Sequence, residues 1–146
     1  MFLNGILFNS EAWQNISEEE MKMFEDVDNH LLRKLMGAHS KTSIAFLHLE
    51  TGSLPIRFVI ANRRLVYYFN ILSKPQNELI LRVFKAQMKS PTKGDFFLTV
   101  GKDFELIGEK MESYNETIIK NMKLSVYKKL MKNKVRMACY EYLKGI

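Results

Sequence analysis

Apolar residues recur every three or four positions along most of this chain of 146 residues, and that spacing constrains the fold more than any other feature. It places apolar side chains on one face of a helix. Proline occurs only at positions 55, 75 and 91, and no Asn-Gly pair separates two alternating apolar and polar runs, as it would in a β-hairpin. The sequence therefore predicts an all-α fold, one irregular bundle of five or six helices.

The clearest helix is predicted over residues 18–36. Ser17 and Glu20 form a capping box in which each side chain can bond the other residue's backbone amide. Gly37 stands where a left-handed residue commonly ends a helix. The residues that share its apolar stripe are Met21, Phe24, Val27, Leu31 and Leu35.

Further helices are predicted where the same spacing returns between polar links. Gly52 and the Lys74-Pro75 pair end two of them, Asp95 caps another, and residues 111–116 are predicted to be a polar link. The predicted segments are 43–50, 55–72, 77–89, 95–110 and 117–143.

The last predicted helix is amphipathic with a basic flank. Its apolar face is predicted to comprise Leu124, Tyr127, Met131, Val135, Ala138 and Tyr142. Its flank carries Lys128, Lys129, Lys132 and Arg136.

Length and cysteine content limit the class of protein. A chain of this size hides roughly 68% of its unfolded surface on folding, which is enough for one domain with a real core. The longest uncharged runs, 1–10 and 65–73, are about half of the ~20 residues that span a bilayer, so no transmembrane segment is expected. The single cysteine, Cys139, excludes an internal disulfide and fits a reducing compartment. We therefore expect an intracellular protein, in nucleus or cytoplasm.

The formal net charge of +6 is distributed in alternating blocks. Residues 1–30 carry −6, residues 31–94 carry +9, residues 95–116 carry −4 and residues 117–146 carry +7. Such blocks can attract one another in the folded chain, with the remaining charges solvated. They can also place the two basic blocks on one surface that faces a polyanion. The sequence leaves both interpretations open.

No self-contained catalytic site is evident. The histidines at 30, 39 and 48 are nine residues apart, which does not suit a pair of metal ligands on one helical turn. No glycine-rich phosphate loop or serine elbow occurs. Arg136 precedes Cys139 by one turn and could lower its pKa, but a packed cysteine is the simpler interpretation. We expect no catalytic residue, no metal and no cofactor.

Several short stretches resemble a known family. They are Gly5–Trp13 (GILFNSEAW), Phe24, Leu31–Gly37 (LLRKLMG), Leu49–Ile56 (LETGSLPI) and Arg63-Arg64-Leu65. Together they resemble the region after the polymerase palm in non-LTR (LINE-type) retrotransposon reverse transcriptases. The likeness covers residues 2–89, while residues 90–146 share only a Lys-rich helical character.

The resemblance implies a helical thumb that grips template and primer, with residues 1–89 thumb-like and residues 90–146 a helical extension of one domain. By analogy, basic helices would contact the backbone of an RNA–DNA or other duplex. The family's Tyr/Phe-x-Asp-Asp motif and its palm carboxylates are missing from this sequence. Because nucleotide transfer needs those carboxylates to hold two metals, the chain alone should not polymerise DNA.

The leading prediction is thus a non-catalytic nucleic-acid-binding domain. The predicted phosphate contacts are Arg57, Arg63, Arg64, Lys128, Lys132 and Arg136. Trp13 is predicted to be a core or junction anchor. The amino-terminal apolar residues would pack on a polymerase palm, fold back on the helices or drive self-association; these are Phe2, Leu3, Ile6 and Leu7.

Two alternatives remain open. The basic amphipathic helix at the carboxyl end also fits a module that docks on a protein partner or an acidic membrane surface. A third possibility is a translated relic without selected activity.

Overall fold

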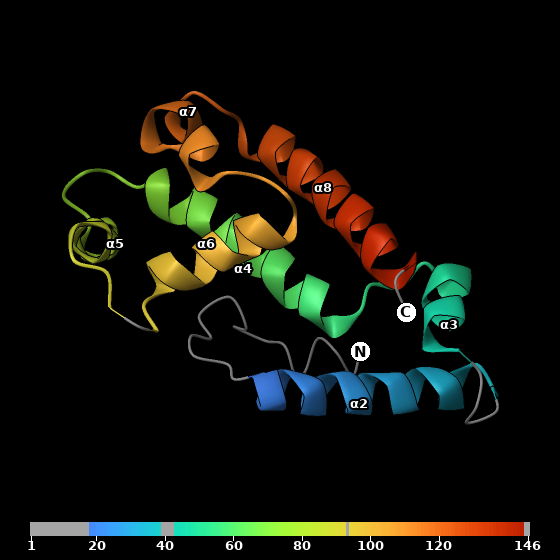
Figure 1. Cartoon of the computed structure of the whole chain (residues 1–146). Helices are drawn as coiled ribbons and strands as arrows, with labels where there is room; N and C mark the ends of the chain where they lie inside the picture. Colours follow the sequence, from blue (N-terminus) through green and yellow to red (C-terminus); the bar gives the residue numbers. More distant parts are fainter. Residues whose placement is uncertain (1–17, 39–42, 93, 145–146) are drawn as a thin grey trace.

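The computed structural model describes residues 18–38, 43–92 and 94–144, and this part of the chain is entirely helical (Figure 1). The predicted all-α class is confirmed. The described residues form seven α-helices, more than the five or six expected, and one 3-10 helix. The α-helices are α2 (Glu18–Leu35), α3 (Ile44–Thr51), α4 (Ile56–Leu72), α5 (Leu79–Lys89), α6 (Phe96–Leu106), α7 (Glu116–Lys120) and α8 (Leu124–Lys144), and the 3-10 helix is η2 (Met111–Tyr114).

Helix α4 is the centre of the bundle. Helix α8 lies alongside it and α6 crosses it, while α2, α5 and α7 also contact it (Figure 1). Ten of its 17 residues are buried, so α4 is covered on most sides and not along a single stripe. A helix surrounded in this way is the expected core element of a small bundle.

Aromatic rings fill the space around α4. The Tyr68 ring meets Phe84 and Phe104 edge-on, with centroids 5.7 and 5.3 Å away. Phe69 packs on Tyr127 of α8, and the Tyr127 hydroxyl donates a 2.7 Å hydrogen bond to the Leu65 carbonyl oxygen. Burying a ring while its polar atom is satisfied combines apolar area with specific geometry.

The predicted helix over 117–143 is wrong in its continuity, because the chain breaks between α7 and α8. At the start of α7, the Asn115 side chain accepts a 3.1 Å hydrogen bond from the Ile118 N–H. At its end, the Asn121 N–H donates a 3.2 Å hydrogen bond to the Ile118 carbonyl oxygen. Ile119 before the break and Tyr127 after it are both fully buried. The turn thus lets Ile119 and Tyr127 both enter the core, although they belong to helices that point in different directions.

The buried face of α8 also differs from the predicted one. Its buried residues recur every fourth position and are Tyr127, Met131, Val135, Cys139 and Leu143. Leu124 and Tyr142 are exposed, and Ala138 is only partly buried. Residues four apart form rows that are inclined to the helix axis. Because α8 packs on its neighbours along such a row, its buried face is not the straight stripe that the sequence predicts.

Smaller differences occur between α6 and α7. Helix α6 ends at Leu106 and not near residue 110, and Gly108 follows with a left-handed φ of 73°. The predicted polar link 111–116 contains η2, whose Tyr114 is buried and accepts a 2.7 Å hydrogen bond from the Tyr68 hydroxyl at its carbonyl oxygen. The segment is polar in sequence, but it contributes one residue, Tyr114, to the core.

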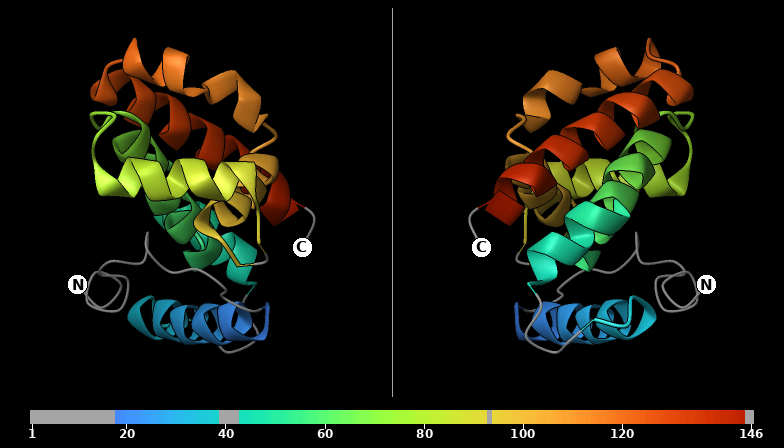
Figure 2. Two further views of the ribbon diagram at one scale, coloured as in Figure 1. Left: turned by 90° about the vertical axis from the view of Figure 1, so that its left-hand side faces the viewer. Right: turned by 90° about the vertical axis from the view of Figure 1, so that its right-hand side faces the viewer.

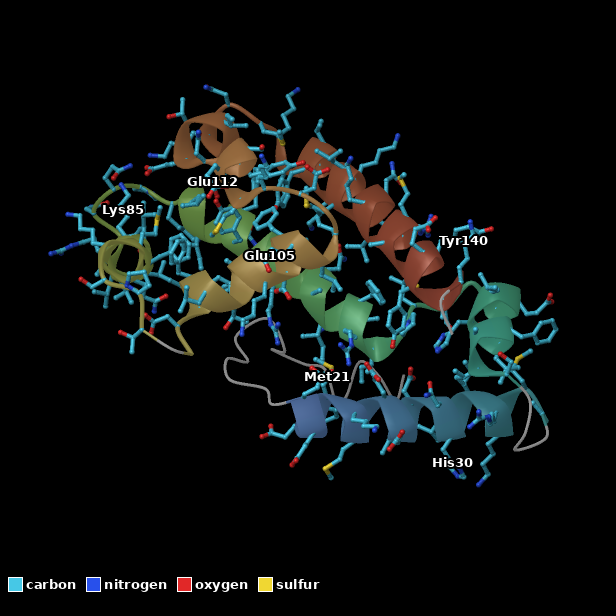
Figure 3. All side chains as sticks on the ribbon, in the orientation of Figure 1. Met21, His30, Lys85, Glu105, Glu112 and Tyr140 are labelled. Carbon is cyan, nitrogen blue, oxygen red and sulfur yellow. The ribbon has the colours of Figure 1, made fainter. Side chains whose placement is uncertain are left out.

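Helices α2 and α3 form the outer part of the described chain (Figure 2). Met21 of α2 packs with Ile56 and Ile60 of α4, and His30 lies on the opposite side of α2 (Figure 3). The predicted left-handed stop at Gly37 is confirmed, with φ of 61°. Gly52, predicted to end the next helix, does so and is also left-handed, with φ of 68°.

The apolar stripe predicted for α2 is only partly covered. Val27 is exposed, and Leu35 is 83% exposed. Met21 and Phe24 at the other end of the stripe pack on α4, so the cover is limited to that end of the helix and to partly buried Leu31. The residues of several predictions lie outside the described part of the chain, namely Phe2, Leu3, Ile6, Leu7, Trp13, Ser17 and His39.

Candidate nucleic-acid interface

A groove of about 510 Å³ lies between the outer face of α4 and the basic flank of α8. It brings together three of the six predicted phosphate contacts, Arg63, Lys128 and Lys132, from two separate basic blocks. Its lining residues are Leu54, Asn62, Arg63, Val66, Tyr67, Asn70, Lys128, Lys132 and Val135. We call this the α4–α8 groove.

Lys128, Lys132 and Arg136 form a row along α8, which we call the α8 row. They follow one another at four-residue intervals, so the row extends about 12 Å along the helix at 1.5 Å per residue. All three are exposed. Among the described residues, no carboxylate oxygen lies within 4.0 Å of their charged nitrogens.

Other lysines of the same region are paired. Lys134 lies 2.7 Å from Glu109, and Lys144 lies 3.7 Å from Glu141. Lys120 and Lys85 both contact Glu116, at 2.9 and 3.1 Å. Within the basic block 117–146, Lys120, Lys134 and Lys144 thus contact carboxylates, whereas the α8 row, like Lys123 and Lys129, has no carboxylate partner among the described residues.

Arg57 lies away from this surface. Its Nη2 donates to Glu18 at 2.5 Å and its Nε to Glu25 at 2.8 Å, which joins α4 to α2. Burial acts to lower the pKa of Arg57, but the hydrogen bonds and charges of Glu25 and Glu18 outweigh it and raise the pKa. The Arg57 guanidinium already bonds two carboxylates of α2, so we do not include it in the candidate interface.

Arg64 lies inside the molecule, 6% exposed, between α4 and α6. Its Nη1 donates to both carboxylate oxygens of Asp103, at 3.2 and 3.4 Å. Burial raises the pKa of Asp103 to about 7, and the charge and hydrogen bonds of Arg64 act in the opposite direction. An arginine in this position cannot reach a ligand on the surface, so Arg64 is also left out.

The attraction between charge blocks thus accounts for part of the basic surplus. Each of these pairs joins an acidic block to a basic one: Arg57 with Glu18 and Glu25, Arg64 with Asp103, Lys85 with Glu116, Lys134 with Glu109. The cations that stay exposed include the α8 row beside the α4–α8 groove. Both interpretations of the block pattern therefore apply, each to different residues.

Two asparagines of the groove were not among the predicted site residues. Asn62 and Asn70 are eight residues apart on α4 with Val66 between them, so all three share one face of the helix. A helical projection of residues 55–72 could have identified them as an uncharged polar pair beside Arg63. Only the packing of α8 against α4 places that face next to lysines.

Tyr67 connects the α4–α8 groove with a smaller apolar depression. Its ring packs edge-on against Phe96 at 5.5 Å, and it lines both hollows. The second depression, of about 110 Å³, is lined by Tyr67, Ile71, Ile80, Val83, Phe84, Gln87 and Phe96. Tyr67 is thus an aromatic side chain at the edge of the core and also lines the groove.

The described residues offer little for catalysis. No group of three or more His, Cys, Asp or Glu in ranges 18–38, 43–92 and 94–144 is placed to hold a metal ion. Cys139 is buried, and burial raises the pKa of its thiol. The expectation that Arg136 could lower that pKa is wrong, because desolvation dominates.

Comparisons with known protein families, with curated proteins and with solved structures found no match. Within the described helices, none is by itself long and apolar enough to cross a membrane. Only α3 and α4 taken together pass such a test of length and composition, with a 52° bend between them, and α4 is largely buried in the bundle.

Proposed function

We propose that this chain is a non-catalytic nucleic-acid-binding domain that holds a phosphate backbone on the α8 row and the adjoining α4–α8 groove. The observation that carries the proposal is the α8 row itself, three exposed cations in line, with no carboxylate within ion-pair distance among the described residues. Phosphates attract such a row, and binding gains free energy from the counterions that the nucleic acid releases.

The resemblance to the post-palm region of non-LTR reverse transcriptases supports the same proposal. A thumb-like segment of that family would grip backbone without supplying polymerase carboxylates. In this view the basic helices would serve one function, and nucleotide transfer would need a separate palm.

The packing of α8 disfavours the membrane or helix-docking alternative. That alternative needs the apolar face of α8 to meet a lipid surface or a partner groove. In the folded chain Tyr127, Met131 and Val135 on that face are fully buried, and α8 packs against α4. Docking through that face would require α8 to leave the core, whereas phosphate binding uses only its exposed flank.

The proposal is tested by removing the row's charge without changing its helix. The triple variant Lys128→Gln, Lys132→Gln, Arg136→Gln lowers the net charge from +6 to +3 and keeps residues of similar helix propensity. We expect weaker binding to a fluorescent oligonucleotide in anisotropy titrations. The slope of log K against log salt should also become shallower by about 2 to 3, since each lost phosphate contact contributes about 0.7 to 0.9.

A matched control carries Lys22→Gln, Lys102→Gln and Lys110→Gln, three exposed lysines outside the groove, and has the same net charge of +3. It should keep most of the affinity and slope. The proposal fails if the wild-type chain binds no single strand, duplex or RNA–DNA hybrid at low salt, or if the control loses as much as the triple variant.

A further inference from the structure

Resting on the proposed function, we propose that the α4–α8 groove accepts an unpaired base of a single-stranded segment, whose phosphates follow the α8 row. The base would lie against Tyr67 and hydrogen-bond to the amides of Asn62 and Asn70. The domain would then prefer single strands, or the single-stranded part of a junction, over a continuous duplex.

The shape of the surface is the first argument. A duplex presents its backbone outward and keeps its bases stacked inside, so phosphate contacts require only an exposed row of cations. Here the row borders a hollow of about 510 Å³, within the range of pockets that hold small organic groups. An unpaired base can turn into such a hollow, while a paired base cannot.

The chemistry of the lining is the second argument. Tyr67 contributes an aromatic ring, Asn62 and Asn70 contribute amides, and Leu54, Val66 and Val135 contribute apolar surface. Proteins bind unpaired bases by stacking them on aromatic rings and hydrogen-bonding their edges, while cations follow the backbone. A groove for phosphates alone would need neither a ring nor amides.

An unsatisfied acceptor is the third argument. The Asn62 carbonyl oxygen is buried and has no hydrogen-bond partner in the described structure. A buried acceptor without a donor is costly, and most such groups in folded proteins are paired. Every base carries an N–H donor on its Watson–Crick edge, but pairing occupies that donor in a duplex. Asn62 lines the groove, so turning its amide toward an unpaired base would give this acceptor a donor.

The length of the row agrees with a short strand. About 12 Å of α8 has room for only a few phosphates of one strand. The footprint on this chain would then be a few nucleotides, with the base beside Tyr67 and phosphates continuing toward Arg136.

The experiment compares three labelled probes of one sequence and about 16 nucleotides: a single strand, a blunt duplex and an RNA–DNA hybrid. Anisotropy is measured at about 50 mM and about 200 mM salt. The wild-type chain should bind the single strand most tightly. Tyr67→Leu keeps apolar volume but removes the ring, and it should weaken single-strand binding by about fivefold to about a hundredfold while changing duplex binding little.

Further variants separate stacking and hydrogen bonding from loss of fold. Tyr67→Phe should retain the preference, and Asn62→Ala should reduce it even if Tyr67→Leu proves unstable by circular dichroism. Tyr140→Leu and Asn133→Ala, at exposed positions of α8 outside the groove lining, should change nothing. Poly-glutamate, which has charge without rings, should compete poorly with the single strand.

The outcomes distinguish the two proposals. Salt-dependent binding that responds to the α8 row, but shows equal affinity for duplex and single strand and no effect of Tyr67→Leu or Asn62→Ala, overturns the base-binding inference and leaves the proposed function standing. Equal competition by poly-glutamate also overturns it. No binding of any probe overturns both.

Discussion

Arg63 and Arg64 are neighbours in the sequence, and the fold separates their roles completely. Arg63 lines the α4–α8 groove, while Arg64 lies between α4 and α6 against Asp103. A rotation of about 100° per residue along a helix is sufficient to turn one side chain outward and the next inward. Whether a cation can meet a phosphate is therefore decided residue by residue.

The buried Arg64–Asp103 pair leads to a prediction at this scale. Asp103→Ala should destabilise the protein by about 3–5 kcal/mol at pH 8, because it leaves the Arg64 charge buried without a partner. Replacing both with apolar residues, Arg64→Met with Asp103→Leu, should recover most of that loss. Urea unfolding of the three proteins measures it, and a double variant as unstable as Asp103→Ala would contradict the argument.

The pH dependence of the same pair has a defined sign. The pKa of Asp103 is raised to about 7 in the folded protein, so the folded state holds a proton that the unfolded state releases near pH 4. The stability from this group should be fully present below about pH 4 and lost as pH rises through about 7. The apolar double variant should not show that loss.

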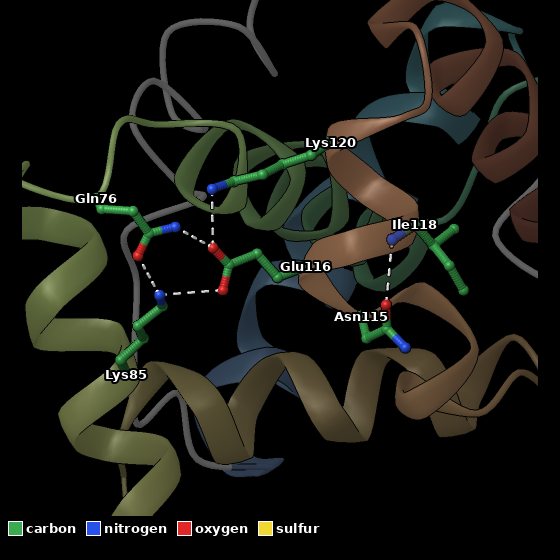
Figure 4. A network of polar contacts seen from close by, with 6 residues as sticks. All are labelled: Gln76, Lys85, Asn115, Glu116, Ile118 and Lys120. Carbon is green, nitrogen blue, oxygen red and sulfur yellow. Dashed lines mark hydrogen bonds and ion pairs between the residues drawn. The ribbon is translucent and has the colours of Figure 1, made fainter.

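At the scale of elements, Glu116 joins three parts of the chain (Figure 4). It accepts from Lys120 of its own helix at 2.9 Å, from Lys85 of α5 at 3.1 Å, and from Gln76 in the connection between α4 and α5. Hydrogen bonds from Lys120 and Gln76 hold the pKa of Glu116 down at about 2. A single carboxylate thus fastens α7 to α5 beside the end of α4.

Glu116→Gln is predicted to cost about 0.2–1 kcal/mol per lost ion pair, because these groups are partly exposed and solvent screens them. Since the folded pKa is lowered, this stabilisation should be present above about pH 4.5 and lost as pH falls toward 2. Thermal unfolding across that range measures it. Glu141→Gln serves as the control, because its exposed contact with Lys144 is 3.7 Å long and should contribute almost nothing.

Over the whole molecule, the core depends on α4 and α8 together. Five residues of α8 belong to the main apolar cluster. Two aromatic contacts, Phe69–Tyr127 and Phe58–Tyr142, join the ends of α4 and α8. The carboxyl-terminal helix is therefore a structural part of the domain as well as the helix that carries the α8 row.

We predict that a chain truncated after Glu116 loses cooperative folding. Removing Ile119, Tyr127, Met131 and Val135 would expose the apolar side of α4 that they cover. The expected result is a broad thermal transition by circular dichroism and increased binding of a hydrophobic dye. A sharp transition in the truncated chain would show that α8 is an appendage. This is why point substitutions on the exposed flank, and not deletion, test nucleic-acid binding.

Local sequence rules predicted most of the helices well. The periodicity of Met21–Leu35, Pro55 before α4, and the left-handed glycines at 37 and 52 all act within a few residues, so they can be read without the fold. The break at Asn121 has local causes, the Asn115 cap and the turn back to Ile118, which apolar periodicity does not contain. The buried Tyr114 and the inclined face of α8 depend on contacts between distant segments.

The sequence alone determined that this chain is helical, that its charge alternates in blocks, and that two basic blocks exist. Only the tertiary structure decided which cations remain available, because pairing partners such as Arg57 with Glu18 and Arg64 with Asp103 lie 39 residues apart. It also decided that Asn62 and Tyr67 face Lys128 and Lys132 across one groove. Helix formation is governed by neighbours along the chain, whereas a binding surface is made by the helices that pack beside one another.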